Sequence, residues 1–303
     1  MPKRLKIAHV WQGVSGRYGY WNDGLRAALE ILRKKYDIDF VEPTADLEPY
    51  DLLFYHEAPC TINGPHGENY KRVMNYSKPK ALLFAGGQVN RGQWEGFNEI
   101  AVESKINVKE FKEQGKDVFT AFGVNTTLFK PTEAKSKYKV VHHGTCASWK
   151  RQDLLAQAFG KDSLLIGRFQ EKDPSMFNNA RDLGATVLDE LTGEPLVKAI
   201  SLAKVMLQTS AYWGGGQRCT LEAMAMGLPV ICMSDSPKNI EYVEESGAGV
   251  VCDPNVESIR AAYDKIIENY EDYSQKGIEY VQSKWTEQHY ADNLDKICQR
   301  LLS

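Results

Sequence analysis

Strand-like and helix-like segments alternate along the whole chain, and this alternation is interrupted only once. Before the interruption, short apolar segments that favour strands occupy residues 6–11, 38–43, 51–59, 80–87, 99–104 and 117–122. After it, similar segments occupy residues 139–144, 163–169, 185–190, 204–209, 228–233 and 248–253. Strands that alternate with helices form parallel sheets covered by helices on both faces. The chain therefore predicts an α/β fold with two Rossmann-like, doubly wound domains whose sheets face a central cleft.

The interruption sets the expected domain limits. Residues 123–139 are polar, contain a proline and show little periodicity, which is typical of a linker. We expect an N-terminal domain over residues 1–128 and a C-terminal domain over residues 129–285. Amphipathic helical patterns close the chain at residues 255–269, 271–283 and 286–302.

The composition is that of a soluble globular protein, with 43% hydrophobic and 25% charged residues among 303. A formal net charge of −3 does not favour binding to nucleic acid or to anionic lipid. No apolar run approaches the roughly 18–20 residues of a membrane span, and the N-terminal residues do not read as a signal peptide. The six cysteines lack the spacing of a zinc site, so we expect reduced thiols in a cytoplasmic protein with no integral membrane contact.

Ligands of doubly wound sheets bind at the carboxyl ends of the strands, so the loops that follow the strands deserve inspection. In the first loop, Gly13, Gly16 and Gly19 fit G-x-x-G-x-x-G, which is not the dinucleotide fingerprint. Such a turn either brings backbone N–H groups to an anion or is simply flexible. In the loop at 144–155, Lys150 and Arg151 stand just before a helix, where a surface cation pair is the simpler interpretation.

The loop after residues 204–209 carries the strongest signal, YWGGGQRCTLEAMAMGLPVIC (212–232). Its three glycines, at 214–216, leave the backbone unobstructed before an expected helix start at Cys219-Thr220-Leu221. Free N–H groups in that first turn suit a phosphate. Glu222, expected in the same turn, suits the two adjacent hydroxyls of a ribose. Together these features predict a nucleotide site.

Three segments resemble one known family. TLEAMAMGLPVICMSDSPKNIEYVEESGAGVVCDP (220–254) is similar to the donor-site segment of family-4-type retaining glycosyltransferases, which have the two-domain GT-B fold. GTCASWKRQDLLAQAF (144–159) and FGVNTTLFKP (122–131) resemble two further segments of that family, in the right order and spacing. The resemblance runs over nearly the whole chain. It also implies that the last helix, with its apolar stripe at Tyr290, Leu294, Ile297 and Leu301, packs back on the N-terminal domain over residues 286–303.

The resemblance assigns roles to particular residues. Lys150 matches the lysine that neutralises the donor pyrophosphate, and Glu222 matches the acid that holds the ribose. His56 matches a histidine beside the reacting sugar, although a buried strand-end histidine is the alternative. The remaining expected donor contacts are Gly13, Gly16, Gly144, Thr145, Arg151, Gly214, Gly215, Gly216, Thr220 and Leu221.

Two positions depart from the family pattern. Gly214 occupies the place of the first acid of E-x7-E, and Thr145 occupies the place of an arginine. Arg218 and Arg151 are available to replace the missing positive charge. Nothing obvious replaces the acid, which in the family contacts the transferred sugar.

The resemblance implies a retaining hexosyl- or pentosyltransferase that uses a nucleotide-diphosphate-sugar, such as a UDP-sugar, without a cofactor or metal ion. Lys150, Arg218 and the amides of 214–221 would stabilise the leaving diphosphate. Glu57 is the one acid to test as a nucleophile for a double displacement. Arg17, Tyr18 and Tyr20 either stack on an acceptor ring or pack on their own domain.

The acceptor hydroxyl and the reaction itself stay open at this level. A glycan, a small molecule and a modified nucleic-acid base are all compatible acceptors, although the net charge does not support the last. A sugar-nucleotide epimerase of the same fold is one alternative function. A non-catalytic nucleotide-sugar-binding protein is the other, and Gly214 is the best argument for it.

Overall fold

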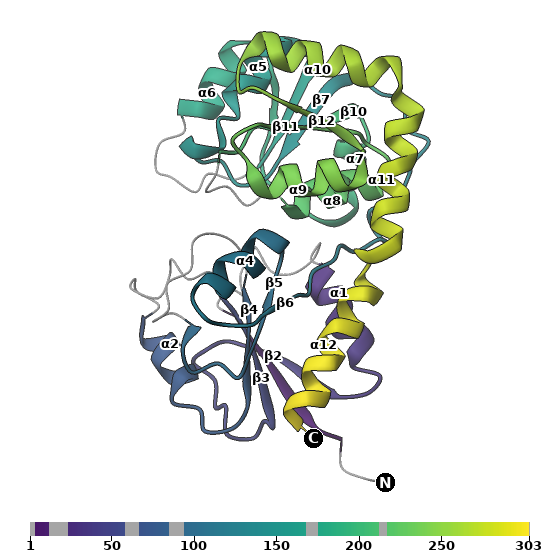
Figure 1. Cartoon of the computed structure of the whole chain (residues 1–303). Coiled ribbons are helices and arrows are strands. Elements are labelled where there is room, and N and C mark those ends of the chain that lie inside the picture. Colours follow the sequence, from purple (N-terminus) through teal and green to yellow (C-terminus); the bar gives the residue numbers. More distant parts are fainter. Residues whose placement is uncertain are drawn as a thin grey trace. The chain divides into compact units, whose positions relative to one another are not determined.

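The chain forms two compact units in a computed structural model that describes residues 4–11, 24–57, 67–84, 94–167, 175–211 and 217–302 (Figure 1). Unit 1 comprises Met1–Gly123 and Glu287–Ser303, and unit 2 comprises Val124–Thr286. The chain thus enters unit 2 a few residues earlier than the linker pattern predicts. Across the described residues, no helix combines the length and apolar character needed to cross a membrane.

Unit 1 is built on a six-stranded parallel sheet with the order β2-β1-β3-β4-β5-β6. Its strands are β1 (Lys6–Val10), β2 (Asp37–Val41), β3 (Leu52–Glu57), β4 (Lys80–Phe84), β5 (Glu99–Val102) and β6 (Phe119–Thr120). Its helices are α1 (Gly24–Leu32), α2 (Gly67–Met74), α4 (Lys105–Glu113) and α12 (Glu287–Leu302). The strand order reverses between β1 and β3, so the switch point of this sheet lies at their carboxyl ends.

Continuous apolar segments explain the central strands. All five residues of β4 are buried, as expected for a strand covered on both faces. Val73 of α2 and Phe111 of α4 pack with β-strand residues in one buried cluster. α4 begins at Lys105 because the Ser104 hydroxyl accepts a 3.3 Å hydrogen bond from the Asn107 N–H and caps the helix.

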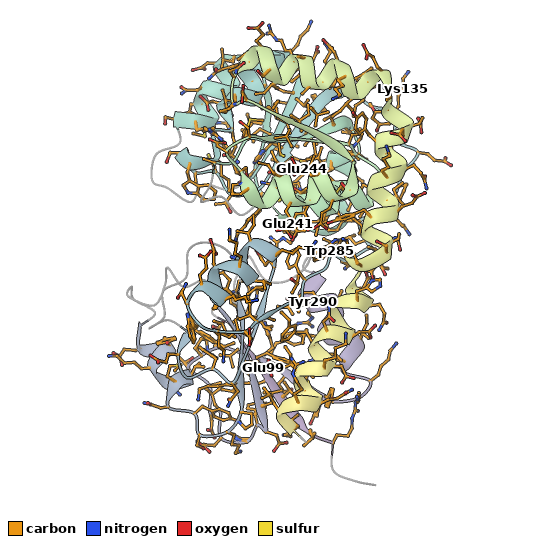
Figure 2. The ribbon with its side chains drawn as sticks, viewed as in Figure 1. Glu99, Lys135, Glu241, Glu244, Trp285 and Tyr290 are labelled. Carbon is orange, nitrogen blue, oxygen red and sulfur yellow. The ribbon has the colours of Figure 1, made fainter. Side chains whose placement is uncertain are left out.

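The C-terminal helix α12 belongs to unit 1 and lies beside α1 (Figure 1). Leu294 and Ile297 are fully buried, and the Tyr290 ring lies 6.0 Å from that of Phe122 (Figure 2). Leu301, the last residue of the predicted stripe, is half-buried. Asp295 fixes the other side of the contact by accepting a 2.6 Å hydrogen bond from the Tyr36 hydroxyl. The apolar stripe therefore supplies the contact that returns the chain to unit 1.

Unit 2 is built on a second six-stranded parallel sheet with the order β12-β11-β10-β7-β8-β9. Its strands are β7 (Tyr138–His143), β8 (Ser163–Ile166), β9 (Thr186–Leu188), β10 (Ala203–Gln208), β11 (Val230–Met233) and β12 (Gly249–Cys252). Its helices are α5 (Asp153–Phe159), α6 (Ser175–Asp182), α7 (Gly193–Ile200), α8 (Gln217–Ala225), α9 (Pro237–Ser246), α10 (Val256–Glu268) and α11 (Tyr270–Lys284), with 3₁₀ turns η2 (Ser148–Lys150) and η3 (Gly160–Asp162). The order reverses between β7 and β10, which places the switch point of unit 2 there.

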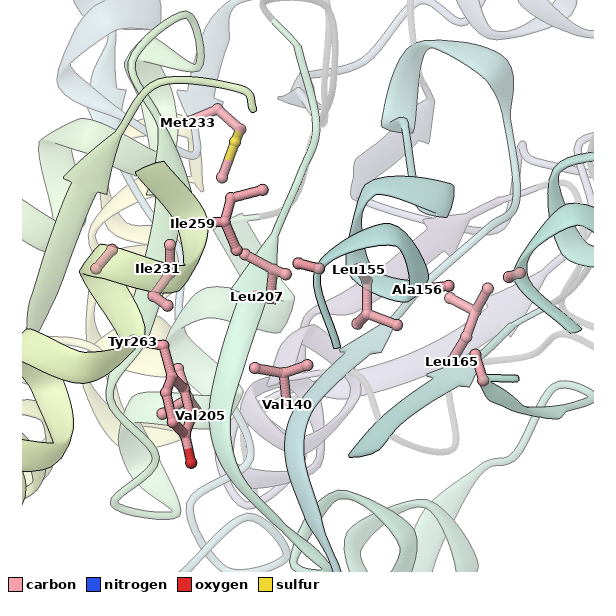
Figure 3. Close-up of a cluster of buried hydrophobic side chains, with 14 of the residues drawn as sticks. Val140, Leu155, Ala156, Leu165, Val205, Leu207, Ile231, Met233, Ile259 and Tyr263 are labelled. Carbon is pink, nitrogen blue, oxygen red and sulfur yellow. The ribbon is translucent and has the colours of Figure 1, made fainter. Parts of the chain in front are cut away.

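Helices cover both faces of the unit 2 sheet. On one face, β-strand residues such as Val140, Leu207 and Ile231 pack against α5, α6 and α10 in a cluster that includes Leu155 and Ile259 (Figure 3). On the other face, α8 packs against α9 and α11 (Figure 1). Successive residues of a strand point to opposite faces, so His142 and His143 at the end of β7 face different layers.

The chain leaves unit 2 beside the point where it enters. The Val124 N–H donates a 2.8 Å hydrogen bond to the Trp285 carbonyl, and Val124 and Thr286 form a parallel bridge. Trp285 ends α11 and packs edge-on against Tyr242 at 5.2 Å (Figure 2). The segment that enters unit 2 and the segment that leaves it are therefore hydrogen-bonded to each other.

Replacing Leu294 by alanine removes a fully buried side chain of α12 and should cost about 2–5 kcal/mol of unfolding free energy. Denaturant unfolding followed by circular dichroism measures this loss. Leu5→Ala is the matched control in the same unit, because Leu5 is 37% exposed and its truncation should cost about 0.5 kcal/mol or less. Equal losses in the two variants would show that α12 does not hold unit 1 together.

Candidate functional site

Buried polar side chains gather at the switch point of unit 2. They come from the carboxyl end of β7, the η2 turn, the carboxyl end of β10 and the first half of α8. Burial of polar and charged groups is costly unless they are paired or serve a ligand, so this cluster marks a candidate site. Its members are His142, His143, Lys150, Gln208, Thr209, Cys219 and Glu222.

Three hydrogen bonds tie η2 to the end of β10. The Thr209 hydroxyl donates to the Lys150 carbonyl at 2.5 Å, and Arg151 Nε donates to the Thr209 carbonyl at 3.0 Å. The Ala211 N–H donates to the Trp149 carbonyl at 3.0 Å. These bonds bridge about 60 residues of sequence and fix the backbone that carries Lys150.

Arg151 is engaged on its outer side by Asp235, which follows β11. The guanidinium donates two parallel hydrogen bonds, of 2.8 and 2.7 Å, to the two carboxylate oxygens. These hydrogen bonds hold the pKa of Asp235 below its ordinary value. The donor contact expected for Arg151 stays a prediction, and its guanidinium lies against Asp235 and Thr209. It acts there as a brace for the turn.

Two glycines allow the backbone to close around the site. Gly144 follows β7 with φ +142°, and a Cβ at this position would lie 3.2 Å from Lys150 Nζ. At Gly167, after β8, a Cβ would lie 1.9 Å from the Gly144 carbonyl oxygen, so only glycine fits. The expected contact residue Thr145 is half-buried, and its carbonyl accepts a 3.2 Å hydrogen bond from Gln152.

Lys150 is buried, with only 9% of its surface exposed. The interpretation of Lys150 as part of a surface cation pair is therefore wrong. The three hydrogen bonds between η2 and the end of β10 hold the turn so that Lys150 points inward. Its ammonium lies 5.1 Å from the centre of the Trp149 ring and near Gly144. A buried ammonium interacts more strongly with an anion than an exposed one does.

His142 is a neutral neighbour of this ammonium. Its Nδ1 lies 2.8 Å from the Leu207 carbonyl and donates to it, which leaves the Nε2 lone pair as an acceptor. Complete burial, followed by the charge of Lys150, lowers the pKa of His142 to about 3. Within the described part of the chain, Nε2 has no hydrogen-bond partner. It lies on the Gly144 side of the ring, 3.9 Å from where a Cβ of that residue would stand.

His143 lies between a thiol and a carboxylate. Its Nδ1 is 3.6 Å from Cys219 Sγ, and its Nε2 is 3.2 Å from Glu222 Oε2. Burial alone would lower the pKa of His143, but the negative charges of Cys219 and Glu222 raise it to about 10. The other carboxylate oxygen of Glu222 lies 3.7 Å from Arg218 Nε, whose side chain is 50% exposed. His143 therefore holds its ring proton more tightly than an ordinary histidine does.

These three residues also offer ligand atoms that a metal could use, since the atoms lie within 4.8 Å of one another. Their arrangement does not suit a single ion, however. The thiol faces one ring nitrogen of His143 and the carboxylate faces the other, and a metal binds only one nitrogen of an imidazole. The geometry is that of a relay from sulfur through imidazole to carboxylate.

The helix that carries this cluster begins earlier than its sequence suggests. α8 starts at Gln217, so Cys219 and Thr220 lie in its first turn and Glu222 in its second. The expectation of Glu222 in the first turn is therefore wrong. The Thr220 hydroxyl donates to Asn239 Oδ1 at 2.7 Å, and Leu221 is fully buried in the core. Of these two residues, only backbone groups remain for a ligand.

In unit 1, His56 lies at the end of β3, at that sheet's own switch point. Its ring stacks on Trp11 at 5.9 Å and lies 5.7 Å from the ring of His9. Burial lowers the pKa of His9 well below its ordinary value. The backbone of Glu57 ends β3, while its side chain and the following expected residues lie outside the described part of the chain: Gly13, Gly16, Arg17, Tyr18, Tyr20, Gly214, Gly215 and Gly216.

Sequence reasoning missed the side chains of six polar residues of this site: His142, His143, Gln208, Thr209, Cys219 and Asp235. The first two carried a usable signal, because a His-His pair ends an apolar strand directly before Gly144. Polar residues at that position of a central parallel strand point to its carboxyl edge. Nothing in the sequence pairs Cys219 or Asp235 with partners 76 and 84 residues away.

The two doubly wound units define a class, the GT-B-type glycosyltransferases, and solved structures of that class share this fold. Sucrose-phosphate synthase from Thermosynechococcus elongatus matches with a TM-score of 0.77 at 14% identity, over 99% of each chain. A glycosyltransferase from Rickettsia africae matches with a TM-score of 0.72 at 14% identity, over 99% of each chain. Anabaena HepE in complex with UDP and glucose matches with a TM-score of 0.69 at 13% identity, over 98% of this chain and 100% of that one.

The family follows from the sequence of unit 2. Residues 124–283, just over half of the chain, match the family model described as glycosyl transferases group 1. The chain belongs to this family, and it is a glycosyltransferase. A search of curated protein sequences gave no match.

We expect the two neighbouring histidines to differ in charge throughout the neutral range. Because of the pKa directions above, His143 should stay protonated from pH 5 to pH 9, and His142 should stay neutral with its proton on Nδ1. Nitrogen-15 NMR of the imidazole rings measures both states directly, with His143→Asn to assign the signals. If the His143 ring instead titrated near its ordinary value, the proposed charge pairing with Cys219 and Glu222 would be wrong.

Proposed function

We propose that unit 2 binds the diphosphate of a nucleotide-sugar at its switch point, and that the protein transfers the sugar to an acceptor hydroxyl with retention at the anomeric carbon. The observation that carries this proposal is the placement of Lys150. A buried ammonium, an open glycine turn at Gly144 and the first turn of α8 meet where ligands of such sheets bind. Bound UDP in the similar Anabaena HepE structure supports a UDP-sugar, carrying a hexose or a pentose, as the donor.

The same charges explain how the bond would break. Cleavage leaves negative charge on the diphosphate while the sugar becomes oxocarbenium-like. Lys150 neutralises that charge inside the protein, where electrostatic stabilisation is stronger than in water. Arg218 is the second cation in this proposal. Its side chain is half-exposed and lies one helix turn before Glu222. With two cations and a helix N-terminus at the diphosphate, the transfer needs no metal ion, so a chelator should leave the rate unchanged.

Glu222 is the proposed ribose ligand. One of its carboxylate oxygens is occupied by His143, and the oxygen on the Arg218 side is the one that a ribose hydroxyl would reach. The His143 ring sets the orientation of this carboxylate. A carboxylate accepts hydrogen bonds from two hydroxyls.

Unit 1 supplies the acceptor side in this proposal. His56, at the unit 1 switch point, is the candidate neighbour of the reacting sugar, and Glu57 is the acid to test as a nucleophile. Arg17, Tyr18 and Tyr20 remain candidates for acceptor stacking, with a glycan or a small molecule as the acceptor. We further propose that the protein works in the cytoplasm.

Incubation with a mixed pool of nucleotide-sugars and candidate acceptors, followed by mass spectrometry, tests the reaction. Free nucleotide diphosphate together with a glycosylated acceptor is the expected result. An isomerised donor would make the protein an epimerase, and unchanged donor that nevertheless binds would make it a non-catalytic nucleotide-sugar-binding protein. The anomeric configuration of the product, read by NMR, tests retention.

Lys150→Ala should reduce transfer by roughly 2–4 kcal/mol of transition-state stabilisation, the loss typical of a charge-assisted contact to a developing anion. Steady-state rates measure this effect. Lys204→Ala is the matched control, because Lys204 lies on the exposed side of β10 and should leave the rate unchanged. A Lys150→Ala protein with the parent's turnover would remove Lys150 from the site.

Glu222→Gln should weaken the binding of UDP as well as of UDP-sugar, because both ligands carry the ribose. Calorimetric titration with each ligand measures the change, which we expect to be about 1–3 kcal/mol for a lost charged hydrogen bond. Gly214→Glu, which restores the acid of the family pattern, should change affinity for UDP-sugar and leave UDP unaffected. Unaltered UDP binding by Glu222→Gln would make Glu222 a structural partner of His143 alone.

A further inference from the structure

Cys219 has an unusual setting for a cysteine in the core of a domain. Its Sγ lies 3.6 Å from Nδ1 of His143, and the opposite nitrogen of that ring lies 3.2 Å from the Glu222 carboxylate. The order thiol, imidazole, carboxylate is the arrangement that activates nucleophilic cysteines: the imidazole takes the thiol proton and the carboxylate holds the ring in place. Both partners are buried, so water does not screen them.

The charges around Cys219 stabilise a thiolate. In the described part of the chain, the titratable groups that face it are His143 from β7, Lys150 from η2 and Glu222 from α8. Burial alone would raise the pKa of the thiol, but the His143 imidazolium and then Lys150 lower it below its ordinary value despite the nearby Glu222. The position of Cys219 in the first turn of α8 acts in the same direction.

Three other cysteines in the described residues, Cys232, Cys252 and Cys298, have raised pKa values. Burial raises the pKa of Cys298 to about 12 and that of Cys232 further still. Cys252 is the most exposed of the set, and burial together with Asp253 raises its pKa to about 11. The thiol of Cys252 is therefore the more exposed of the two, whereas the thiol of Cys219 is the one whose pKa is lowered.

Cys219 also borders the space proposed for the diphosphate. A Cβ built on Gly144 would lie 3.2 Å from Lys150 Nζ and 3.8 Å from Cys219 Sγ. The ammonium and the sulfur thus line the same small space beside this glycine. An anion held by Lys150 would stand between a small reagent and the sulfur.

We propose that Cys219 is a modification site for hydroperoxides, activated by His143 and Glu222 and shielded when a nucleotide diphosphate occupies the neighbouring space. The thiolate attacks one peroxide oxygen, so that an S–O bond forms and the O–O bond breaks. Hydroxide leaves and takes a proton to become water. The sulfur is oxidised by two electrons to a sulfenic acid while the peroxide is reduced. The activation stands on the geometry of the cluster, whereas the shielding rests on the proposed function of unit 2.

The pH dependence of alkylation tests the activation in the intact protein. Iodoacetamide labelling at pH 5.5 to 9, with each cysteine resolved by peptide mass spectrometry, gives the relative rates. Cys252 should gain about tenfold in rate per pH unit, as an ordinary thiol does below its pKa, while the rate of Cys219 should change much less with pH because its neighbours stabilise the thiolate. At pH 6 Cys219 should therefore exceed Cys252 by at least about tenfold. Faster labelling of Cys252, parallel profiles, or no labelling of native Cys219 would overturn the proposal.

The His143→Asn variant tests whether Cys219 reacts because His143 activates it or only because reagents can reach it. His143→Asn should lower Cys219 labelling at pH 6 at least about tenfold and restore the steep pH profile of an ordinary thiol. Circular dichroism checks that the variant folds. If it does not fold, the pH dependence of Cys219 alkylation in the parent protein tests the activation on its own. Retention of the flat profile in a folded His143→Asn protein would exclude His143 as the activating group.

Oxidation with hydrogen peroxide, trapped with dimedone, tests the modification and the shielding. Dimedone should mark Cys219 before any other described cysteine, and saturating UDP should slow this at least about tenfold, while Cys252 alkylation measured with and without UDP should stay constant. Oxidation elsewhere first would overturn the modification site. Oxidation of Cys219 at the same rate with UDP shown by calorimetry to be bound would overturn the shielding alone. Failure of UDP to bind would overturn the proposed nucleotide site and leave the activation to stand on the alkylation profile.

Discussion

The site of unit 2 depends on the hydrogen bonds that tie the η2 turn to the end of β10. A lysine ammonium is costly to bury, and it stays buried only if the backbone beneath it cannot swing outward. The hydroxyl and carbonyl of Thr209 bind the backbone of Lys150 and the side chain of Arg151, respectively, and Asp235 closes the outer side of that guanidinium. This framework spans the ends of β7, β10 and β11. These hydrogen bonds thus fix the position of the Lys150 backbone at the switch point of the sheet.

Once Lys150 is held inside, the surrounding charges must balance. Glu222 and His143 are almost completely buried, and an uncompensated charge at either position would destabilise the fold by several kcal/mol. The His143 imidazole lies between Glu222 and Cys219, and this arrangement raises the pKa of His143 and lowers that of Cys219. His142 avoids the problem by staying neutral and donating its proton to Leu207. The pKa values of the titratable groups in this cluster therefore depend on one another. A charged ligand that binds beside Lys150 will change the pKa of each of them.

The fold was predictable because its signal is local. Apolar segments such as KALLF, which became the fully buried β4, and the stripe through Leu294 on α12 report burial within a few residues. The site was predictable only in part. Gly144, Lys150 and Glu222 could be selected, since loops after strands meet at the switch point, but their burial and charge could not. Those properties depend on contacts such as Thr209 with Lys150 and Cys219 with His143, which join residues 59 and 76 positions apart. The early start of α8 at Gln217 was missed because polar residues precede its apolar pattern.

The two departures from the family pattern can be compared with the titratable groups at the switch point of unit 2. The resemblance places a guanidinium at position 145 and a carboxylate at position 214, and this chain has threonine and glycine there. The switch point of unit 2 carries the His143 imidazole, whose pKa is raised, and the Cys219 thiol, whose pKa is lowered. These two groups differ in chemistry from the pair of the family pattern. Guanidinium and carboxylate groups keep their charge throughout the neutral range, whereas imidazole and thiol groups exchange protons with each other and the thiol reacts with oxidants. Under the proposed oxidation of Cys219, the charge at this switch point depends on the redox state of one sulfur atom.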